Sequence, residues 1–475
     1  MAAWSAAGLT RTVTWRSSIV VTLGAALLVT VSLGPMAQEL GTVSPFIWLV
    51  AAAIGALQCL LLARLAASLF DRAGGTATYT HSAVGRSLPI FGAISSWSYW
   101  FAWTPGIAVN LILAATYLRE TVWPSLGTLP FALVLGGVLY AVNGLGLKIS
   151  MRVATVAAAA ALIPLAAIFA GALVQPSLLH LSYLYPVAVP SHAWRSANTW
   201  GLLVKWLFIT AWSAYGAEMA STIVAEMCDA ESRAARALHV AGGVGLVSFG
   251  LLPFLMLALV GAHGLTEDPL VTFLPVAEAV FGSIGRTVVG VMLTAALILG
   301  AQAFIVGSSR TVYQMTRDGY MPRQFAFTTG RGVPVGSMLW DGTVIVVLLL
   351  IFGTNVVNVV AAANVGYLVV FVLMPLAFVV LERNSRGGAH ILAARPMTWL
   401  ALGLAIFNAL LLIVGGIQWG GKVMFTGIVV IALIVPISAI RRAQDRYHGY
   451  TDLLPFPAGK PHDVVGDLLP TTLEG

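Results

Sequence analysis

The sequence predicts an all-α membrane protein of about twelve transmembrane helices, and three observations support this fold class. Of 475 residues, 59% are hydrophobic and only 9% are charged, whereas a soluble domain carries about 25% charged residues. The apolar residues form runs of about 20, the length that a helix needs to cross roughly 30 Å of hydrocarbon. The basic residues concentrate on one side of the predicted path. Because lipid offers no partner for a free backbone amide, the runs are expected to be helices.

Twelve apolar segments follow one another along the chain. They cover approximately residues 18–37, 46–70, 90–117, 129–147, 153–174, 201–224, 238–262, 287–308, 336–353, 358–381, 397–416 and 423–440. This layout predicts an N-terminal segment, a core of ten helices in two halves, two additional helices and a polar tail. The N-terminal segment is 1–17, and the core is 18–381, with halves 18–174 and 201–381. The two additional helices lie in 397–440, and the tail is 441–475.

The basic residues predict the orientation of the chain. With the N-terminus inside, the outer side receives only Arg119, Arg195, Lys205, Arg286 and Lys422, and the inner side receives the other lysines and arginines of the 25 present. Cytoplasmic loops of membrane proteins carry such an excess. We therefore expect a multi-pass protein of the inner (cytoplasmic) membrane with both termini in the cytoplasm. The net charge of +7 follows from this topology, and no nucleic-acid partner is predicted.

Two segments contain residues that interrupt a helix. The first contains the run Ser32–Pro35; proline removes a backbone donor and glycine relaxes the helix. The sixth contains a glycine and a carboxylate within Trp212–Glu218. Either break alone is more often an ordinary kink, but a matched pair in two corresponding halves indicates an inverted repeat with a midplane site. Freed amides and carbonyls there can hold the two charges of a zwitterion.

Four stretches resemble sequences of the amino acid–polyamine–organocation (APC) family. Phe70–Tyr79 resembles its Pro-x-x-Gly-Gly-x-Tyr loop, and Ser308–Pro322 resembles its Ser-Arg…Ala-Arg-Asp-Gly-x-x-Pro segment, the most specific of the four. Gly332–Pro334 matches the Gly-x-Pro that opens segment nine. Trp212–Glu218 resembles the Trp-Ser-x-x-Gly-x-Glu of the branch that exchanges arginine, agmatine or putrescine.

The resemblance implies a LeuT-like fold, in which a 5+5 inverted repeat is followed by two C-terminal helices. Two departures from the family bear on function. The first break usually reads Gly-Ser-Gly-Ile-Phe, whereas this chain has Ser32–Met36, with Leu33 in place of the small central residue. Many members carry a lysine in segment five that takes the place of a sodium ion, but residues 153–174 contain no ionisable side chain. Proton coupling through that lysine is therefore not expected.

The predicted substrate site gathers residues from both breaks and from segments eight and ten. Glu218 is the leading candidate because a carboxylate at membrane depth is costly and usually faces a cavity or a partner; the alternative is that it caps the broken sixth helix. Trp212 offers an aromatic face to a cation, and ordinary packing is the alternative. The full set is Ser32, Leu33, Gly34, Trp212, Ser213, Tyr215, Gly216, Glu218, Gln302 and Asn364.

Some polar residues have simpler explanations. Gln302, Asn364 and also Asn110 are uncharged groups in apolar runs, and such groups more often bridge helices than touch a ligand. Ser308 and Ser309 are candidate ligands of a sodium ion in a LeuT-like arrangement, but hydrogen bonds back to helix carbonyls explain them better.

Together these features predict a secondary active transporter of amino acids or organic amines, including polyamines, that works by alternating access. An exchanger is the preferred form. Two alternatives stay open: a channel, which favours rings of polar residues, and a membrane-embedded enzyme, which needs a constellation of acids, bases or metal ligands. The expected partners are a small-molecule substrate and the lipid bilayer. No cofactor and no metal ion are expected, and the oligomeric state is not predicted.

Overall fold

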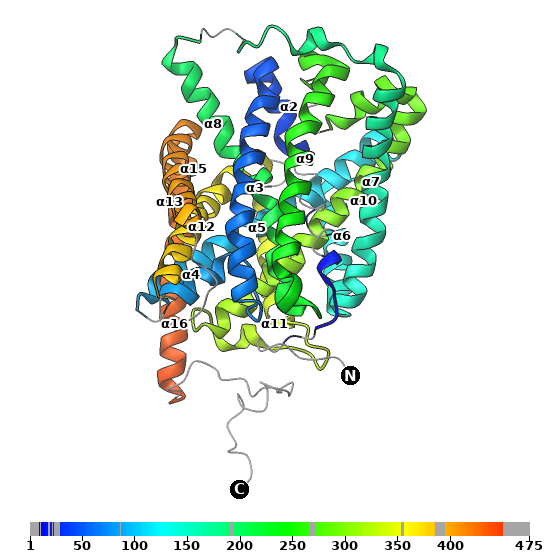
Figure 1. The fold of residues 1–475 in the computed structure, drawn as a ribbon. Helices are drawn as coiled ribbons and strands as arrows, with labels where there is room; N and C mark the ends of the chain where they lie inside the picture. The colour runs from blue at the N-terminus through cyan, green and yellow to red at the C-terminus, as the bar shows by residue number, and fades with distance from the viewer. Residues whose placement is uncertain are drawn as a thin grey trace.

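A computed structural model shows a bundle of helices that run between two ends of the molecule (Figure 1). The structure describes residues 9, 11–17, 20, 22, 29–85, 87–190, 194–266, 271–352, 356–384 and 395–449. Over these residues the regular secondary structure is helical, with turns and loops between the helices and an isolated β-bridge between Val13 and Met227. The predicted all-α class is confirmed for this part of the chain. Most of the predicted tail, 450–475, lies outside the described residues.

The described helices cover the predicted segments from the second onwards. In chain order they are α2 (Val29–Leu40), η1 (Gly41–Val43), α3 (Ser44–Ser68), α4 (Ala77–Val84), α5 (Pro89–Thr121), α6 (Thr128–Gly144), α7 (Leu147–Val174), η2 (Pro176–Leu178), η3 (Leu181–Leu184), α8 (Ala197–Ala214), η4 (Tyr215–Glu226), α9 (Ala230–Thr266), α10 (Phe273–Arg317), η5 (Arg323–Ala326), α11 (Val335–Phe352), α12 (Val356–Asn384), α13 (Arg395–Leu410), η7 (Leu411–Gly415), α14 (Gly416–Trp419), α15 (Gly421–Ala432) and α16 (Ile434–Tyr447). The most extensive pairings are α3 with α9 and α5 with α10.

Seven helical stretches of the described chain are long and apolar enough to cross a membrane. They are Ser32–Ser68, Pro89–Thr121, Ala230–Thr266, Phe273–Arg317, Val359–Asn384, Pro396–Trp419 and Gly421–Tyr447. The bent pair Ala166–Val174 and Pro176–Leu184 makes an eighth if it is one span, and α6 and α11 are shorter apolar helices. The protein is therefore a multi-pass membrane protein. The number of twelve segments stays a prediction.

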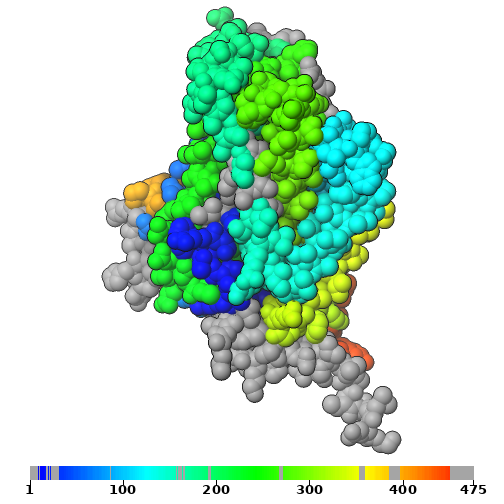
Figure 2. All heavy atoms as spheres, turned by 90° about the vertical axis from the view of Figure 1, so that its right-hand side faces the viewer, coloured from blue at the N-terminus to red at the C-terminus, as the bar shows by residue number. Residues whose placement is uncertain are grey.

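The N-terminal segment is fixed where η4 ends. The backbone amide of Thr12 donates to the carbonyl of Glu226 over 2.9 Å, and that of Cys228 donates to the carbonyl of Val13 over 2.8 Å. The Arg236 guanidinium of α9 lies 4.6 Å from the centre of the Trp15 ring, and in Figure 2 this dark blue segment covers part of the green surface. In Figure 1 the segment and the end of α16 lie at the same end of the molecule. We call it the inner end, as the charge pattern predicts.

Cysteine labelling tests this orientation. Gly330 and Gly421 are exposed, and neither has a heavy atom within 4 Å of an added Cβ, so a cysteine fits at both. In a background without the exposed Cys228, an impermeant thiol reagent applied to intact cells should label Gly421→Cys, predicted outside, and should not label Gly330→Cys, predicted inside. The reverse pattern would overturn the orientation.

Candidate functional site

The sixth predicted segment changes its helix type where the sequence predicts a break. α8 ends at Ala214, and the chain continues as the 3₁₀-helix η4 over Tyr215–Glu226. Runs of 3₁₀-helix longer than three or four residues are uncommon, and inside a longer helix they often mark a hinge or strain. The predicted interruption is therefore confirmed here. Ser213, Gly216 and Glu218 lie in or beside this change, and all three are buried.

Glu218 lies among hydroxyl groups. Its side chain is fully buried. Tyr99 donates a hydrogen bond to Oε2 over 2.9 Å, Tyr367 donates one to Oε1 over 3.2 Å, and Thr76 donates a third. These donors belong to α5, to α12 and to the residue before α4. Glu218 therefore joins η4 to three other parts of the chain, whereas the structural alternative predicted a cap on its own helix.

Four aromatic rings pack beside this carboxylate. Trp103 of α5 has its ring centre 5.0 Å from Phe304, 4.9 Å from Tyr367 and 5.8 Å from Trp212. The indole nitrogen of Trp212 donates to the carbonyl of Ala102 over 2.8 Å. Trp212 thus belongs to an aromatic cluster that also contains Tyr367, a hydrogen-bond donor to Glu218.

Sequence reasoning missed Tyr99 and Trp103, although a signal was present. Trp97, Trp100 and Trp103 recur at intervals of three in the third predicted segment, and residues three apart share a helix face. All three are buried. A tryptophan-lined face of α5 could therefore have been predicted. Tyr367 lies alone in an apolar run and carries no comparable signal.

The hydroxyl of Tyr215 does not bond to Glu218, although its ring centre lies 6.3 Å from that of Tyr367. Its hydroxyl pairs with Oδ1 of Asn408 on α13 over 3.0 Å, and its ring lies 4.9 Å from that of Phe371. The structure therefore directs Tyr215 toward one of the two additional C-terminal helices. Its predicted contact with substrate is not supported by this geometry, because the hydroxyl already has a partner on another helix.

The predicted break at Ser32–Pro35 is wrong: the chain is helical there. α2 is helical throughout Val29–Leu40 and includes Pro35, and Ser32, Leu33 and Gly34 are buried within it. A proline in a membrane helix removes one hydrogen bond, and packing against neighbouring helices lets the helix continue. The preceding residues, 23–28, lie outside the described chain.

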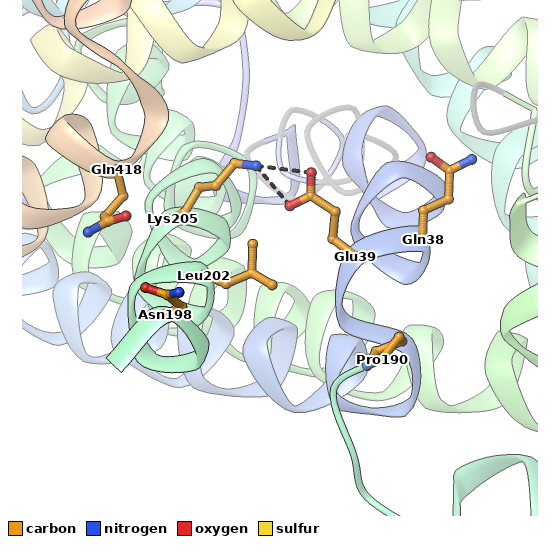
Figure 3. A pocket seen from close by; sticks show the side chains of 7 residues that line it. All are labelled: Gln38, Glu39, Pro190, Asn198, Leu202, Lys205 and Gln418. Atoms are coloured by element: carbon orange, nitrogen blue, oxygen red, sulfur yellow. Dashed lines mark hydrogen bonds and ion pairs between the residues drawn. The ribbon is translucent and has the colours of Figure 1, made fainter. Parts of the chain in front are cut away.

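A polar cavity of about 460 Å³ lies between the outer ends of α2 and α8, beside α14. Figure 3 shows Glu39 of α2 and Lys205 of α8 pointing toward each other across it, with Gln38, Asn198 and Gln418 around them. Lys205 Nζ lies 3.0 and 2.8 Å from the two carboxylate oxygens of Glu39. This cavity is at the end of the molecule opposite the described N-terminal segment.

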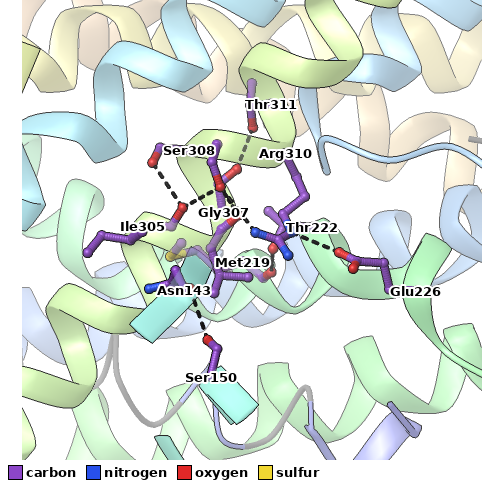
Figure 4. A network of polar contacts seen from close by, with 12 residues as sticks. Asn143, Ser150, Met219, Thr222, Glu226, Ile305, Gly307, Ser308, Arg310 and Thr311 are labelled. Carbon is purple, nitrogen blue, oxygen red and sulfur yellow. Dashed lines mark hydrogen bonds and ion pairs between the residues drawn. The ribbon is translucent and has the colours of Figure 1, made fainter. Parts of the chain in front are cut away.

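Gln302 belongs to a closed ring of polar side chains. Its Oε1 accepts from Asn143 Nδ2 over 3.0 Å, and its Nε2 lies 2.5 Å from Ser150 Oγ. Ser150 donates to Asn143 Oδ1 over 2.9 Å, a contact visible in Figure 4. The ring ties α10 to α6 and α7. Gln302 therefore takes the helix-bridging alternative, and its predicted role in substrate binding is not supported by this geometry.

The side-chain amides of Asn364 and Asn110 also donate hydrogen bonds to helix carbonyls. Asn364 Nδ2 donates to the carbonyl of Phe208 over 2.5 Å and so ties α12 to α8. Asn110 Nδ2 donates to the carbonyl of Gly106 in its own helix over 2.8 Å. Both side chains are fully buried. Asn364 therefore links α12 to α8, the helix that leads into η4. Its amide donor is used for this link between helices.

Asp341 is a second buried carboxylate, and sequence reasoning missed it. Its oxygens accept from Trp100 Nε1 over 2.9 Å, Thr104 Oγ1 over 3.1 Å, Tyr140 over 2.7 Å and Ser308 over 2.5 Å. The donors come from α5, α6 and α10 and hold α11 against them. An acidic residue inside the ninth predicted segment was the available signal.

The hydrogen bonds of Ser308 and Ser309 agree with the simpler prediction for Ser309 only. Ser309 Oγ donates to the carbonyl of Ile305 over 2.6 Å. Ser308 Oγ makes only a long contact of 3.5 Å to the same carbonyl, and its short bond is to Asp341. Helix carbonyls and a carboxylate therefore account for both hydroxyls, and the sodium-ligand interpretation gains no support.

Ion pairs join helices at the inner end. Arg310 Nε of α10 lies 2.8 Å from Oε1 of Glu226, the last residue of η4, and each side chain is only 2% exposed. Figure 4 shows this pair beside Thr222 and Met219. Arg72, between α3 and α4, lies 2.6 Å from Asp318 at the end of α10. We call these two contacts the inner ion pairs; both attach α10 to elements outside it.

The Arg-Asp-Gly stretch, the most specific motif, forms a platform at the same end. Arg441 of α16 donates to the carbonyls of Thr316 and Met321 over 2.8 and 2.6 Å. Tyr320 lies 2.7 Å from His81 Nδ1. Burial, and then the nearby Asp318 carboxylate, raise the pKa of Tyr320, so its hydroxyl stays protonated. The motif thus packs α16 against the end of α10.

Comparisons with known proteins agree with the helical layout. A family model described as amino acid permease matches residues 13–436. The chain is 25% identical over 294 residues to the lysine-specific permease LysP of Lactococcus lactis, covering 57% of this chain and 55% of that protein. It is 24% identical over 344 residues to the uncharacterized amino acid permease YvbW of Bacillus subtilis, covering 70% and 75%. An uncharacterized transporter of Mycobacterium tuberculosis is 27% identical over 308 residues, covering 63% and 64%.

Proposed function

This chain belongs to the amino acid permease family, and on that premise we propose that it is a secondary transporter of an amino acid or organic amine. The family match confirms the resemblance predicted from the motifs and places the chain among transporters rather than membrane-embedded enzymes. The matched region spans little more than half the length of the lysine-specific relative. The substrate and the mechanism are therefore argued from the site.

The proposed substrate site lies at the junction of α8 and η4. The observation that carries it is the setting of Glu218, which is fully buried and accepts hydrogen bonds from three hydroxyl groups. No cation among the described residues pairs with it, and a buried carboxylate without a countercharge is costly. An ammonium group of a substrate supplies the missing charge. The rings of Trp103 and Trp212 offer faces that favour a cation.

The same contacts couple binding to movement. Glu218 is held by Tyr99 of α5 and Tyr367 of α12, so an ammonium at the carboxylate competes with bonds that join η4 to those helices. A ligand shifts a conformational equilibrium by its different affinity for two states. We assign the structure to a state closed at the inner end, supported by the inner ion pairs. The moving parts are either the LeuT-like halves 18–174 and 201–381 or a bundle of segments one, two, six and seven that rocks against the rest.

Exchange is the proposed form of coupling. α7 carries Lys148 and Arg152, but both are exposed near its beginning, and no lysine of the described chain enters the interior from this helix. Purified protein in liposomes preloaded with a substrate amino acid should take up the labelled amino acid much faster than protein in empty liposomes. The measurement is initial uptake with and without a sodium gradient.

The same assay separates a carrier from a channel. A carrier gives saturable, stereoselective uptake that is stimulated by substrate on the opposite side, whereas a channel gives flux along the gradient without counter-stimulation. Strong sodium-driven accumulation in empty liposomes would contradict exchange. Flux that neither saturates nor discriminates stereoisomers would contradict transport by alternating access. The ligand for the assay comes from thermal-shift screening, because a binder stabilises the folded protein by mass action.

A further inference from the structure

The outer cavity carries two opposite charges that a solute can reach. The side chains of Lys205 and Glu39 are 24% and 40% exposed, and together with the amide groups of Gln38, Asn198 and Gln418 they line a space of about 460 Å³. Ligand pockets for small molecules have volumes of this order. An exposed ion pair contributes little to stability, so this pair can open without loss of the fold.

Both charges are oriented by neighbouring rings. Trp206 Nε1 donates to Glu39 Oε2 over 2.8 Å. Lys205 Nζ lies 5.4 Å from the centre of the Trp206 ring and 5.2 Å from that of Trp419. The carboxylate and the ammonium are thus each fixed by contacts that do not depend on their mutual ion pair. If the pair is separated, both groups stay directed toward the cavity.

The cavity lies on the outer side of the proposed central site. Lys205 precedes Trp212 by two helical turns in α8, and Glu39 follows Ser32 by two turns in α2. Residues two turns apart share a helix face and are separated by roughly 10 Å along the axis. A solute in the outer cavity therefore lies about two helical turns outward of Trp212 on α8.

We propose that the outer cavity binds the zwitterionic backbone of an amino acid, inserted into the Glu39–Lys205 ion pair. The ligand's ammonium pairs with Glu39 and its carboxylate with Lys205, so every charge keeps a partner of opposite sign. The amide side chains of Gln38, Asn198 and Gln418 supply further hydrogen bonds. An amine without a carboxylate leaves Lys205 unpaired, and an acid without an amine leaves Glu39 unpaired. The cavity therefore selects zwitterions, whereas the central carboxylate selects cations.

The role of this cavity as an entry site rests on the proposed transport function, but binding to it does not. The test is equilibrium binding of labelled L-lysine and of 1,5-diaminopentane, which differs from L-lysine only by the missing carboxylate, to the purified full-length protein. Lys205→Met should weaken L-lysine binding at the outer of two sites by about tenfold or more, the effect of one charge-assisted hydrogen bond. Binding of the diamine should stay unchanged. Glu39→Gln should likewise weaken L-lysine and leave the diamine unchanged.

Matched variants keep the test decisive. Lys422→Met removes another lysine predicted on the outer side that does not line the cavity, and it should leave both ligands unaffected. Unchanged binding of the diamine by the single variants shows that they still fold, which separates a lost binding site from a loss of folding. Equal effects of Lys205→Met on both ligands, or no second site in the unaltered protein, would overturn the proposal. If L-lysine binds in the outer cavity but the protein transports nothing, the proposed transport function is contradicted and the proposed binding site is not.

Discussion

Replacing Glu218 by glutamine is expected to weaken binding of a cationic ligand by about 10- to 100-fold, with little change for an uncharged ligand of the same shape. A hydrogen bond to a charged group contributes about 1.5–3 kcal/mol, and 1.4 kcal/mol corresponds to a factor of ten. Glutamine keeps the volume and one acceptor oxygen, so the hydroxyls of Tyr99 and Tyr367 can still bond to it. The measurement compares affinities for the two ligands in both proteins.

Tyr367→Phe is the control for this change. It removes one hydroxyl donor from Glu218 and keeps the negative charge, so it should alter the affinities for cationic and uncharged ligands by similar factors. A Glu218→Gln protein that loses both ligands equally would assign Glu218 a purely structural role. An unchanged ratio of the two affinities would remove the carboxylate from the substrate site.

The two membrane carboxylates show what a single sequence reveals. Glu218 and Asp341 both interrupt apolar segments and are both fully buried, so the cost of a charge in lipid marks either as important. Their partners carry no such mark. Tyr140 and Trp100 lie 201 and 241 positions from Asp341 in the chain, and only the packing of α5 and α6 on α11 brings them to it.

Helix continuity was harder to predict than helix existence. The run Ser32–Pro35 has the composition of a break, but α2 passes through it, because neighbouring helices can hold a proline-containing helix together. The stretch around Gly216 has a glycine but no proline, and it does change to a 3₁₀-helix. The proline was therefore not the residue that marked the change of helix type.

The uncharged polar residues illustrate the value of the simpler alternative. Gln302 and Asn364 sit in apolar runs, where bridging between helices is the usual role, and each does bridge helices. Their partners, Asn143 and Phe208, lie 159 and 156 positions away. The role was therefore predictable from the residue type, but the partner was not.

The buried ion pair at the inner end gives the largest expected effect on stability. Arg310→Met leaves the Glu226 carboxylate unpaired with 2% exposure, and breaking one partner of a buried pair costs about 3–5 kcal/mol. Arg119→Met is the matched control, because the Arg119–Glu120 pair is 41% and 35% exposed and such pairs contribute about 0–1 kcal/mol. The measurement is the denaturation midpoint of each purified variant.

A double variant separates the unpaired charge from the loss of packing. Arg310→Met combined with Glu226→Leu removes both charges, and replacing a buried pair by apolar residues of similar volume is often neutral. The N-terminal segment should stay in place, because Thr12 bonds to the backbone carbonyl of Glu226 and not to its side chain. We therefore expect the double variant to recover most of the lost stability.

The double variant also tests whether the inner ion pairs keep the inner end closed. If they do, the stable double variant should react faster with a thiol reagent at Thr222→Cys, which is buried beside the pair. Unchanged reactivity in a variant of restored stability would limit the Arg310–Glu226 pair to holding the fold.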